Sequence, residues 1–243
     1  MELAGRVALV TGAGQRVGQA IAAALGARGM RVAVHYRGSA TGAEATCAMV
    51  RDAGGEAHPF RADLSAAHAP AELVDAVAGH FGALDVLVNS AAVMERTPVA
   101  EVTPDAWDAM FAVNLRAPFF CAQAAARHMR ARGGTIVNLA DLAAFETWPA
   151  YVPHTITKAG VVQMTRALAR TLAPAVRVNG VAPGVVLLPD GWQDADAERL
   201  AATTPLRRNG TPEDVARAVV YLLDAPFVTG ETMLVDGGRH VRT

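Results

Sequence analysis

Short runs of β-branched and other apolar residues alternate with helical stretches along nearly the whole chain. The pattern predicts seven strands, at residues 6–10, 31–35, 58–62, 85–89, 135–139, 176–182 and 232–236. Six helices are predicted between them, at residues 17–28, 43–53, 70–81, 103–130, 155–172 and 212–224. This alternation is typical of a parallel sheet with right-handed crossovers. We therefore expect an α/β fold, a doubly wound seven-stranded sheet with helices on both faces.

The chain is expected to form one domain over residues 1–243. A chain of 243 residues, 52% of them apolar and only 5% aromatic, can build one large core from Ala, Val and Leu. No repeat or linker indicates a boundary. One connection, at about residues 185–205, is unusually long and carries a short amphipathic piece at 197–203. Such connections are often lids, so we expect a substrate lid here, with a packed surface excursion as the alternative.

Charge, hydropathy and cysteine content narrow the class of protein. The 22 Lys and Arg residues balance 23 Asp and Glu residues, so no charge excess draws the chain to nucleic acid or to an anionic membrane. No apolar run approaches the ~18 residues of a membrane span, and MELAGRVALV lacks a signal-peptide pattern. We expect a cytoplasmic protein with a small-molecule partner. Cys47 and Cys121 are isolated, which predicts helix-packing residues and no metal site.

A glycine-rich segment, TGAGQRVG, connects the first predicted strand to the first helix. Gly12 and Gly14 permit backbone angles that a side chain would forbid, and Gly18 permits close packing of helix on strand. The helix N-terminus offers unpaired N–H groups to a pyrophosphate. In this position the segment predicts a dinucleotide site in a Rossmann-like fold, beyond the carboxyl ends of the strands.

The end of the second strand indicates which dinucleotide is bound. Proteins that bind NAD usually carry an acidic residue there to accept the ribose hydroxyls. Here HYRGS places Arg37 and Ser39 where a 2′-phosphate would lie, and residues 28–41 contain no acid. We therefore expect NADP(H) as cofactor, although Arg37 could be a solvated surface residue. Asp63, after the third strand, could accept an adenine amino proton or could cap a helix.

Several motifs in order give the chain a family resemblance over nearly its full length. They are TGAGQRVG, DLS (63–65), NSAA (89–92), VNLRAPFF, TIVNL, KAG (158–160), RVNGVAPG (177–184) and VDGG. In these the chain resembles the short-chain dehydrogenase/reductase family. The resemblance implies a catalytic set of Asn114, Asp141, His154 and Lys158. It also implies cofactor contacts from Lys158, Val17, Tyr36, Leu64, Asn89, Ala91, Pro183 and Gly184.

Within the family the chain is most similar to the pteridine reductase-like branch. Arg16 stands for the usual middle glycine, and Asp141 stands where most relatives have Ser. His154 departs from the pattern, because the family places a proton-donating Tyr four residues before the lysine; Tyr151 is three residues too early. The branch also has an aromatic residue after the NSAA-like motif, where this chain has Val93 and Met94. Candidate substrate contacts are Val93, Trp148, Tyr151, Leu187 and Trp192.

Asp141 and His154 together suggest the type of reaction. A ketone needs a proton donor for its oxygen, whereas an iminium group already carries positive charge and benefits from a nearby anion such as Asp141. The sequence therefore favours NADPH-dependent reduction of a C=N bond in a pteridine-like heterocycle or cyclic imine. Two alternatives stay open: a carbonyl or alcohol oxidoreductase with His154 as acid, and a catalytically weak NADPH-binding sensor or scaffold. The resemblance also implies a homo-oligomer, a dimer or a tetramer.

Overall fold

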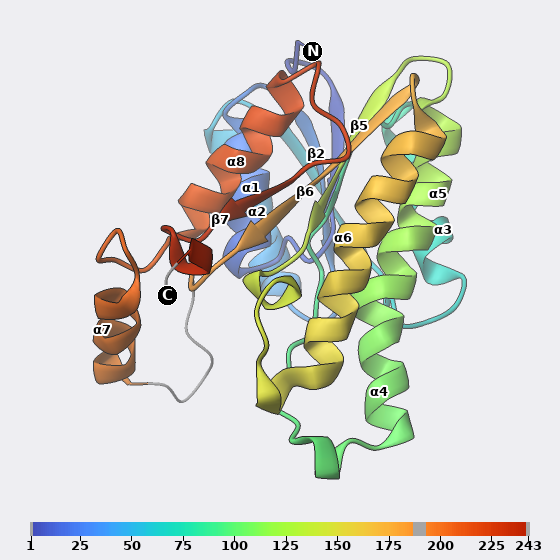
Figure 1. Ribbon diagram of the computed structural model, residues 1–243. Coiled ribbons are helices and arrows are strands. Elements are labelled where there is room, and N and C mark those ends of the chain that lie inside the picture. The colour runs from blue at the N-terminus through green and yellow to red at the C-terminus, as the bar shows by residue number, and fades with distance from the viewer. Residues whose placement is uncertain (1, 187–192, 242–243) are drawn as a thin grey trace.

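The computed structural model describes residues 2–186 and 193–241, which contain one seven-stranded parallel sheet (Figure 1). The strands lie in the order β3-β2-β1-β4-β5-β6-β7, and every neighbouring pair is parallel. Their bounds are β1 Val7–Val10, β2 Arg31–Tyr36, β3 Glu56–Arg61, β4 Val86–Asn89, β5 Gly134–Leu139, β6 Val176–Pro183 and β7 Thr232–Val235. The predicted fold class is confirmed. The strand order reverses between β1 and β4, where doubly wound sheets bind ligands.

Helices cover both faces of the sheet. Their bounds are α1 Arg16–Gly26, α2 Ala40–Asp52, α3 Ala69–Phe81, α4 Pro104–Phe111, α5 Ala117–Met129, α6 Val152–Leu172, α7 Asp194–Thr203 and α8 Pro212–Asp224. Apolar side chains of α1, α2 and α8 form one core with the sheet, and those of α3, α5 and the end of α6 form another. Strand β1 serves both cores, because Ala8 and Val10 point into the first while Val7 and Leu9 point into the second.

The helix predicted at residues 103–130 is interrupted. Thr103 caps α4 by accepting the Ala106 N–H at 3.2 Å, and residues Ala112–Arg116 then form a π-helical turn before α5 begins. Pro118, in the first turn of α5, has no N–H to offer the carbonyl of Asn114 four residues earlier, which favours the wider turn. The prediction of one continuous helix was therefore wrong. Asn114 lies buried in this π-helical turn.

The amphipathic piece at 197–203 belongs to α7, which begins at Asp194 with a capping box. Leu187 and Trp192, two of the candidate substrate residues, lie outside the described residues. Among the helices of the described ranges, none combines the length and apolar character that a membrane span requires.

Candidate active site

A cavity of about 510 Å³ opens at the carboxyl ends of β1, β2 and β4. The glycine-rich segment forms one part of its wall, and the first turns of α6 form another. Most of the sequence-predicted site residues line it: Gly12, Gly14, Arg16, Val17, Gly18, Tyr36, Arg37, Ser39, Asp63, Leu64, Ala91, Val93, Asp141, His154 and Lys158. The topology thus brings into one cavity residues that are distant in the sequence.

Two glycines of the phosphate loop are required by close backbone approaches. Gly12 has a φ of +66°, and a Cβ there would lie 2.8 Å from the Cα of Ala91. A Cβ on Gly18 would lie 2.3 Å from the carbonyl oxygen of Gly12, so helix α1 could not approach the loop with a larger residue. Gly14 differs from the prediction: its φ is not positive, and its Cβ would instead crowd the Ser39 carbonyl at 3.3 Å.

Arg16 has a left-handed backbone conformation, which glycine adopts most readily. Its φ is +55°, a region that costs a residue with a Cβ roughly 1–2 kcal/mol. Helix α1 begins at this residue, and both Arg16 and Arg37 line the cavity. The backbone is therefore strained at Arg16, the residue that brings a second cation to the cavity wall.

The carboxylate of Asp63 holds a turn as well as lining the cavity. Its Oδ1 accepts hydrogen bonds from the Ser65 hydroxyl at 2.7 Å and the Ser65 N–H at 3.0 Å. These bonds, helped by the charge of Arg37, lower the pKa of the carboxyl group. The side chain is thus held ionised at the edge of the cavity. It caps a turn and not a helix, because α3 begins only at Ala69, after His68.

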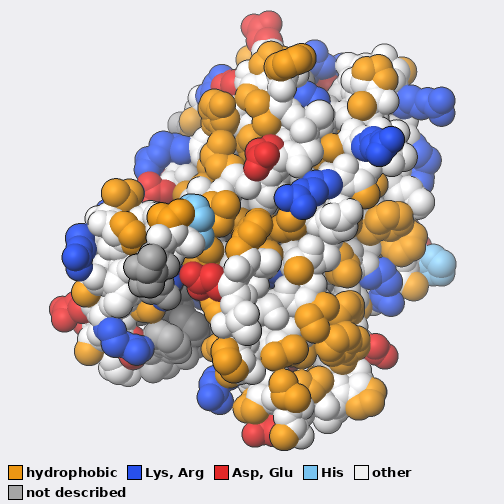
Figure 2. Space-filling model, viewed as in Figure 1, with side chains coloured by type: hydrophobic (Ala, Val, Ile, Leu, Met, Phe, Trp, Pro, Cys, Tyr) orange, Lys and Arg blue, Asp and Glu red, His pale blue; other side chains and the backbone are white. Residues whose placement is uncertain are grey.

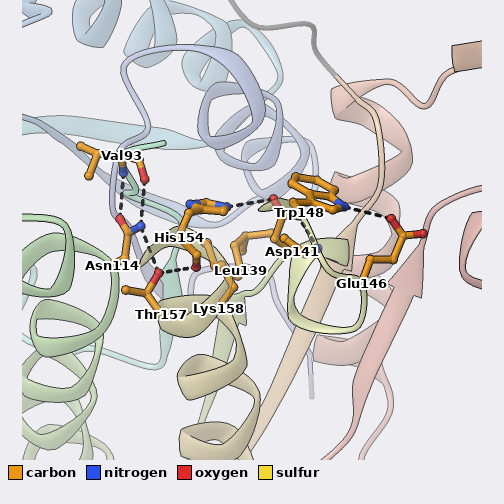
Figure 3. A network of polar contacts seen from close by, with 10 residues as sticks. Val93, Asn114, Leu139, Asp141, Glu146, Trp148, His154, Thr157 and Lys158 are labelled. Carbon is orange, nitrogen blue, oxygen red and sulfur yellow. Dashed lines mark hydrogen bonds and ion pairs between the residues drawn. The ribbon is translucent and has the colours of Figure 1, made fainter. Parts of the chain in front are cut away.

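The other part of the cavity wall carries His154, Asp141 and Lys158 (Figure 3). The His154 side chain is only 2% exposed, and its Nε2 lies 3.6 Å from Oδ2 of Asp141. Neither ring nitrogen has a hydrogen-bond partner among the described residues. A buried imidazole with unpaired nitrogens has lost its hydration without gaining hydrogen bonds, which is costly unless a ligand supplies a partner.

Lys158 lies one helical turn after His154, on the same side of α6. Its Nζ donates to the carbonyl oxygen of Leu139 at 2.8 Å, at the end of β5. Burial lowers the pKa of Lys158, and the Asp141 carboxylate opposes that shift. One of the three ammonium protons is therefore used within the protein, and the group faces the cavity from a fixed position.

Asp141 has a structural role in addition to its place beside His154. Its Oδ1 accepts the Ala143 N–H at 2.8 Å and so caps the short turn Leu142–Ala144. The side chain is 23% exposed, and Oδ2 is the oxygen that faces the imidazole. One carboxylate thus fixes the loop after β5 with one oxygen and faces His154 with the other.

Asn114 lies behind the cavity wall. Its amide exchanges two 2.8 Å hydrogen bonds with the backbone N–H and C=O of Val93. Its Nδ2 also donates to the Thr157 hydroxyl at 3.3 Å, and that hydroxyl donates to the carbonyl oxygen of His154 at 2.7 Å. This network connects the segment after β4 to the first turn of α6 (Figure 3). Asn114 therefore positions both Val93 and His154.

Comparison with known proteins identifies the family. A family model described as enoyl-(acyl carrier protein) reductase matches residues 12–240. The chain is 36% identical over 241 residues to a 3-oxoacyl-(acyl-carrier-protein) reductase of Synechocystis sp., covering 97% of each protein. It is also 36% identical over 253 residues to versicolorin reductase of Emericella nidulans, covering 97% of this chain and 96% of that protein. The chain belongs to the short-chain dehydrogenase/reductase family.

A solved structure agrees with this assignment. The crystal structure of the angucycline C-6 ketoreductase LanV with bound NADP superimposes with a TM-score of 0.92 at 32% identity, covering 99% of this chain and 98% of that one. Short-chain dehydrogenases/reductases are oxidoreductases that use nicotinamide cofactors. The chain is accordingly an oxidoreductase of this family.

Some expected contacts of this short-chain dehydrogenase/reductase lie outside the cavity wall that the described residues form. Asn89 is a buried bridge, because its Nδ2 donates to the Pro118 carbonyl at 3.2 Å and to Asn138 Oδ1 at 2.9 Å. Gly184, after Pro183, is required by β7, since a Cβ there would lie 2.8 Å from that of Asp236. Side-chain contact with a cofactor in this cavity is therefore not indicated for these residues.

Two of the three aromatic candidates, Trp148 and Tyr151, also lie off the cavity wall formed by the described residues. Trp148 donates its indole N–H to Glu146 at 3.0 Å and packs edge-to-face with Tyr151 at a centroid distance of 6.1 Å. Tyr151 ends the short turn Pro149–Tyr151 that precedes α6, whereas His154 lies in α6 and lines the cavity. The expectation that Trp148 and Tyr151 contact the substrate is not supported by this geometry.

His35 is a cavity-lining residue that the sequence did not indicate as functional. It lies in the apolar run RVAVH, and its side chain is buried between β1 and β3. A histidine near the end of a buried parallel strand was the available signal, because buried polar side chains need partners.

Proposed function

We propose that this oxidoreductase is an NADP(H)-dependent carbonyl reductase in which His154 donates the proton to the substrate oxygen. The observation that carries the proposal is the buried imidazole of His154, whose two ring nitrogens have no hydrogen-bond partner in the described structure although the ring lines the cavity. A substrate carbonyl in the cavity would supply the missing partner. General acid catalysis of this kind contributes ~10²–10⁴-fold to a rate.

The preference for NADP(H) rests on the charges at the end of β2. Arg37 and Ser39 line the cavity there, and Arg16 adds a second cation. A ribose 2′-phosphate carries negative charge that these groups would neutralise. Residues 28–41 contain no Asp or Glu, which fits the same preference, since a carboxylate there would repel the phosphate.

Each residue at the catalytic part of the cavity would have a separate task. The bound cofactor would supply the hydride. His154 would donate a proton from its ring, and the Asp141 carboxylate, 3.6 Å away, would stabilise the imidazolium before the transfer. Lys158, fixed by its bond to Leu139, would bind the nicotinamide ribose. Asn114 would keep Val93 and the first turn of α6 in register through its amide bonds.

A carbonyl substrate is favoured over the C=N bond that the sequence alone favoured. Two of the compared relatives are named as a 3-oxoacyl reductase and a ketoreductase, and a ketone oxygen requires a proton donor, which an imidazole can be. A pteridine-like substrate lacks an obvious aromatic partner, because Val93 and Met94 line the cavity and Trp148 lies off its wall in the described structure.

Reduction of a cyclic imine stays as a second candidate because of one specific observation. Asp141 contributes a carboxylate to the cavity wall, where it could stabilise a cationic iminium substrate directly. A third alternative, an NADPH-binding sensor without turnover, has no feature of its own in its favour. Carbonyl reduction, imine reduction and a sensor role predict different outcomes in one experiment.

The experiment is a panel of neutral ketones, cyclic imines and dihydropteridines, assayed by oxidation of NADPH and NADH with the wild type and Asp141→Asn. We expect oxidation of NADPH with ketones, and a reduced but measurable ketone rate in Asp141→Asn. Turnover of imines alone, abolished in Asp141→Asn, would support the second candidate instead. Tight NADPH binding without oxidation of any substrate, and without gain in His154→Tyr, would support a sensor.

A homo-oligomer, dimer or tetramer, is also proposed. Exposed apolar side chains include Phe119 and Phe120 on α5 and Ile156 on α6. Figure 2 shows hydrophobic side chains gathered over α4 and the adjoining part of α6. Contiguous apolar surface of this kind is often an interface. Analytical ultracentrifugation tests the proposed oligomer, and a monomer at micromolar concentration would contradict it.

A cytoplasmic location stays a prediction.

A further inference from the structure

His35 lies where three segments of the nucleotide-binding half meet. It is the fifth residue of β2, a strand that pairs with β1 on one side and β3 on the other. The residue is 2% exposed, yet its ring reaches the cavity wall beside the glycine-rich loop. No step of the proposed reaction uses it.

His35 binds two consecutive N–H groups of the phosphate loop. Its Nδ1 accepts the N–H of Gly12 at 3.0 Å, and its backbone carbonyl accepts the N–H of Ala13 at 2.8 Å. The opposite ring nitrogen, Nε2, lies 3.2 Å from the carbonyl oxygen of Ala62, just after β3. One residue therefore connects the loop after β1 to the segment after β3.

These partners fix the tautomer of the ring. An N–H group can bond Nδ1 only if that nitrogen is unprotonated, so the proton is on Nε2, which then donates to Ala62. Burial lowers the pKa of His35 to about 4, against the opposing effects of the Ala62 bond and the Asp63 carboxylate. Above that pH the ring is neutral, and its Nδ1 lone pair is available to Gly12.

The loop needs such support because its backbone is unusual. Gly12 and Arg16 both have positive φ angles, at +66° and +55°, and conformations of this kind persist only where the surroundings determine them. A second side chain contacts the same segment, since the Thr46 hydroxyl lies 2.9 Å from the carbonyl oxygen of Ala13 and shares its single proton between that oxygen and the Gly42 carbonyl oxygen, also at 2.9 Å. Gly12 and Ala13 thus contact residues of two different elements, His35 of β2 and Thr46 of α2.

We propose that His35 is a positioning residue for the dinucleotide: its neutral ring holds the phosphate loop in the conformation that binds NADPH. The inference rests on the proposed NADP(H) site. Loss of the Nδ1 acceptor would leave the part-buried Gly12 N–H without its protein partner, and the loop would lose a bond that holds it against β2.

The test compares His35→Leu, which removes the acceptor, with His35→Asn, whose Oδ1 can accept the Gly12 N–H from a similar position. The dissociation constants of NADPH and NADH are measured by nicotinamide fluorescence, together with kcat at saturating NADPH. We expect His35→Leu to weaken NADPH binding at least about 5-fold, with kcat nearly unchanged. His35→Asn should recover most of the affinity. Thr46→Val should weaken binding in the same direction.

Equal NADPH affinities in the wild type and a folded His35→Leu variant would overturn the inference alone. A wild-type chain that binds neither dinucleotide would overturn the proposed function as well. If His35→Leu does not fold, the nitrogen NMR signals of the wild-type imidazoles decide. A neutral ring protonated on Nε2, whose Nδ1 signal shifts when NADPH is added, supports the inference. A ring protonated on Nδ1 overturns it.

Discussion

Acidification should destabilise the fold through His35, by an amount that follows from its burial. Burial lowers the pKa of the folded imidazole to about 4, whereas an unfolded histidine titrates near ~6.5. Between these values the unfolded chain binds the proton and the folded chain does not, so the free energy of unfolding decreases as the pH falls. The expected loss is about 2 kcal/mol between pH ~8 and pH ~5, and about 3 kcal/mol by pH ~4.

Urea unfolding at a series of pH values measures this loss, with His35→Asn as the variant that cannot titrate. Other groups, including the Asp63 carboxylate near the ring, titrate in both proteins, so the difference between the two curves isolates His35. The free energy of unfolding of the wild type minus that of His35→Asn should decrease toward low pH, with a slope approaching ~1.4 kcal/mol per pH unit. His68→Asn, which changes an exposed histidine, should keep the wild-type slope. Parallel curves for the wild type and His35→Asn would refute the reasoning.

Two further predictions concern the cofactor site. Arg37→Asp should shift the preference from NADPH toward NADH, because a carboxylate at the end of β2 repels a 2′-phosphate and can accept ribose hydroxyls; the ratio of kcat/KM for the two cofactors checks this, and an unchanged ratio would place the cation elsewhere. Gly18→Ala should abolish NADPH binding and destabilise the chain, because its Cβ would lie 2.3 Å from the Gly12 carbonyl oxygen. Gly79→Ala, in α3 with nothing within 4 Å of the added Cβ, should instead raise the free energy of unfolding by up to ~1 kcal/mol and so raise the thermal midpoint. Similar effects of Gly18→Ala and Gly79→Ala on the thermal midpoint would contradict the packing argument.

The sheet was predictable because its strands are buried on both faces. VALV is apolar at every position, and TIVNL is buried at every position although two of its residues are polar, a pattern typical of parallel strands covered by helices. The strand order and the position of the cavity then follow from the handedness of the crossovers. The interruption at Ala112–Arg116 was not predicted, because helical periodicity changes little over a single π-helical turn.

Within the site, sequence motifs located residues better than they defined roles. Asn89 lies in a matching motif, yet its amide donates inside the core to the Pro118 carbonyl and to the Asn138 side chain. Gly14 was expected to need a special backbone angle, but contact with the Ser39 carbonyl is what restricts it. The role of His35 depends on pairing between β1, β2 and β3, which brings Gly12 and Ala62 to opposite sides of one ring. Such partners are distant in the chain and have no local sequence signal.

The central claim, that His154 is the proton donor, is tested most directly by single-turnover hydride transfer from NADPH to a ketone found in the panel. His154→Gln preserves a polar side chain without the acid, and His154→Tyr installs a phenol at the same position. We predict a rate ~10²–10⁴-fold lower in His154→Gln, an unchanged NADPH dissociation constant, and recovery of the rate in His154→Tyr. A His154→Gln variant that transfers hydride at the wild-type rate would contradict the assignment.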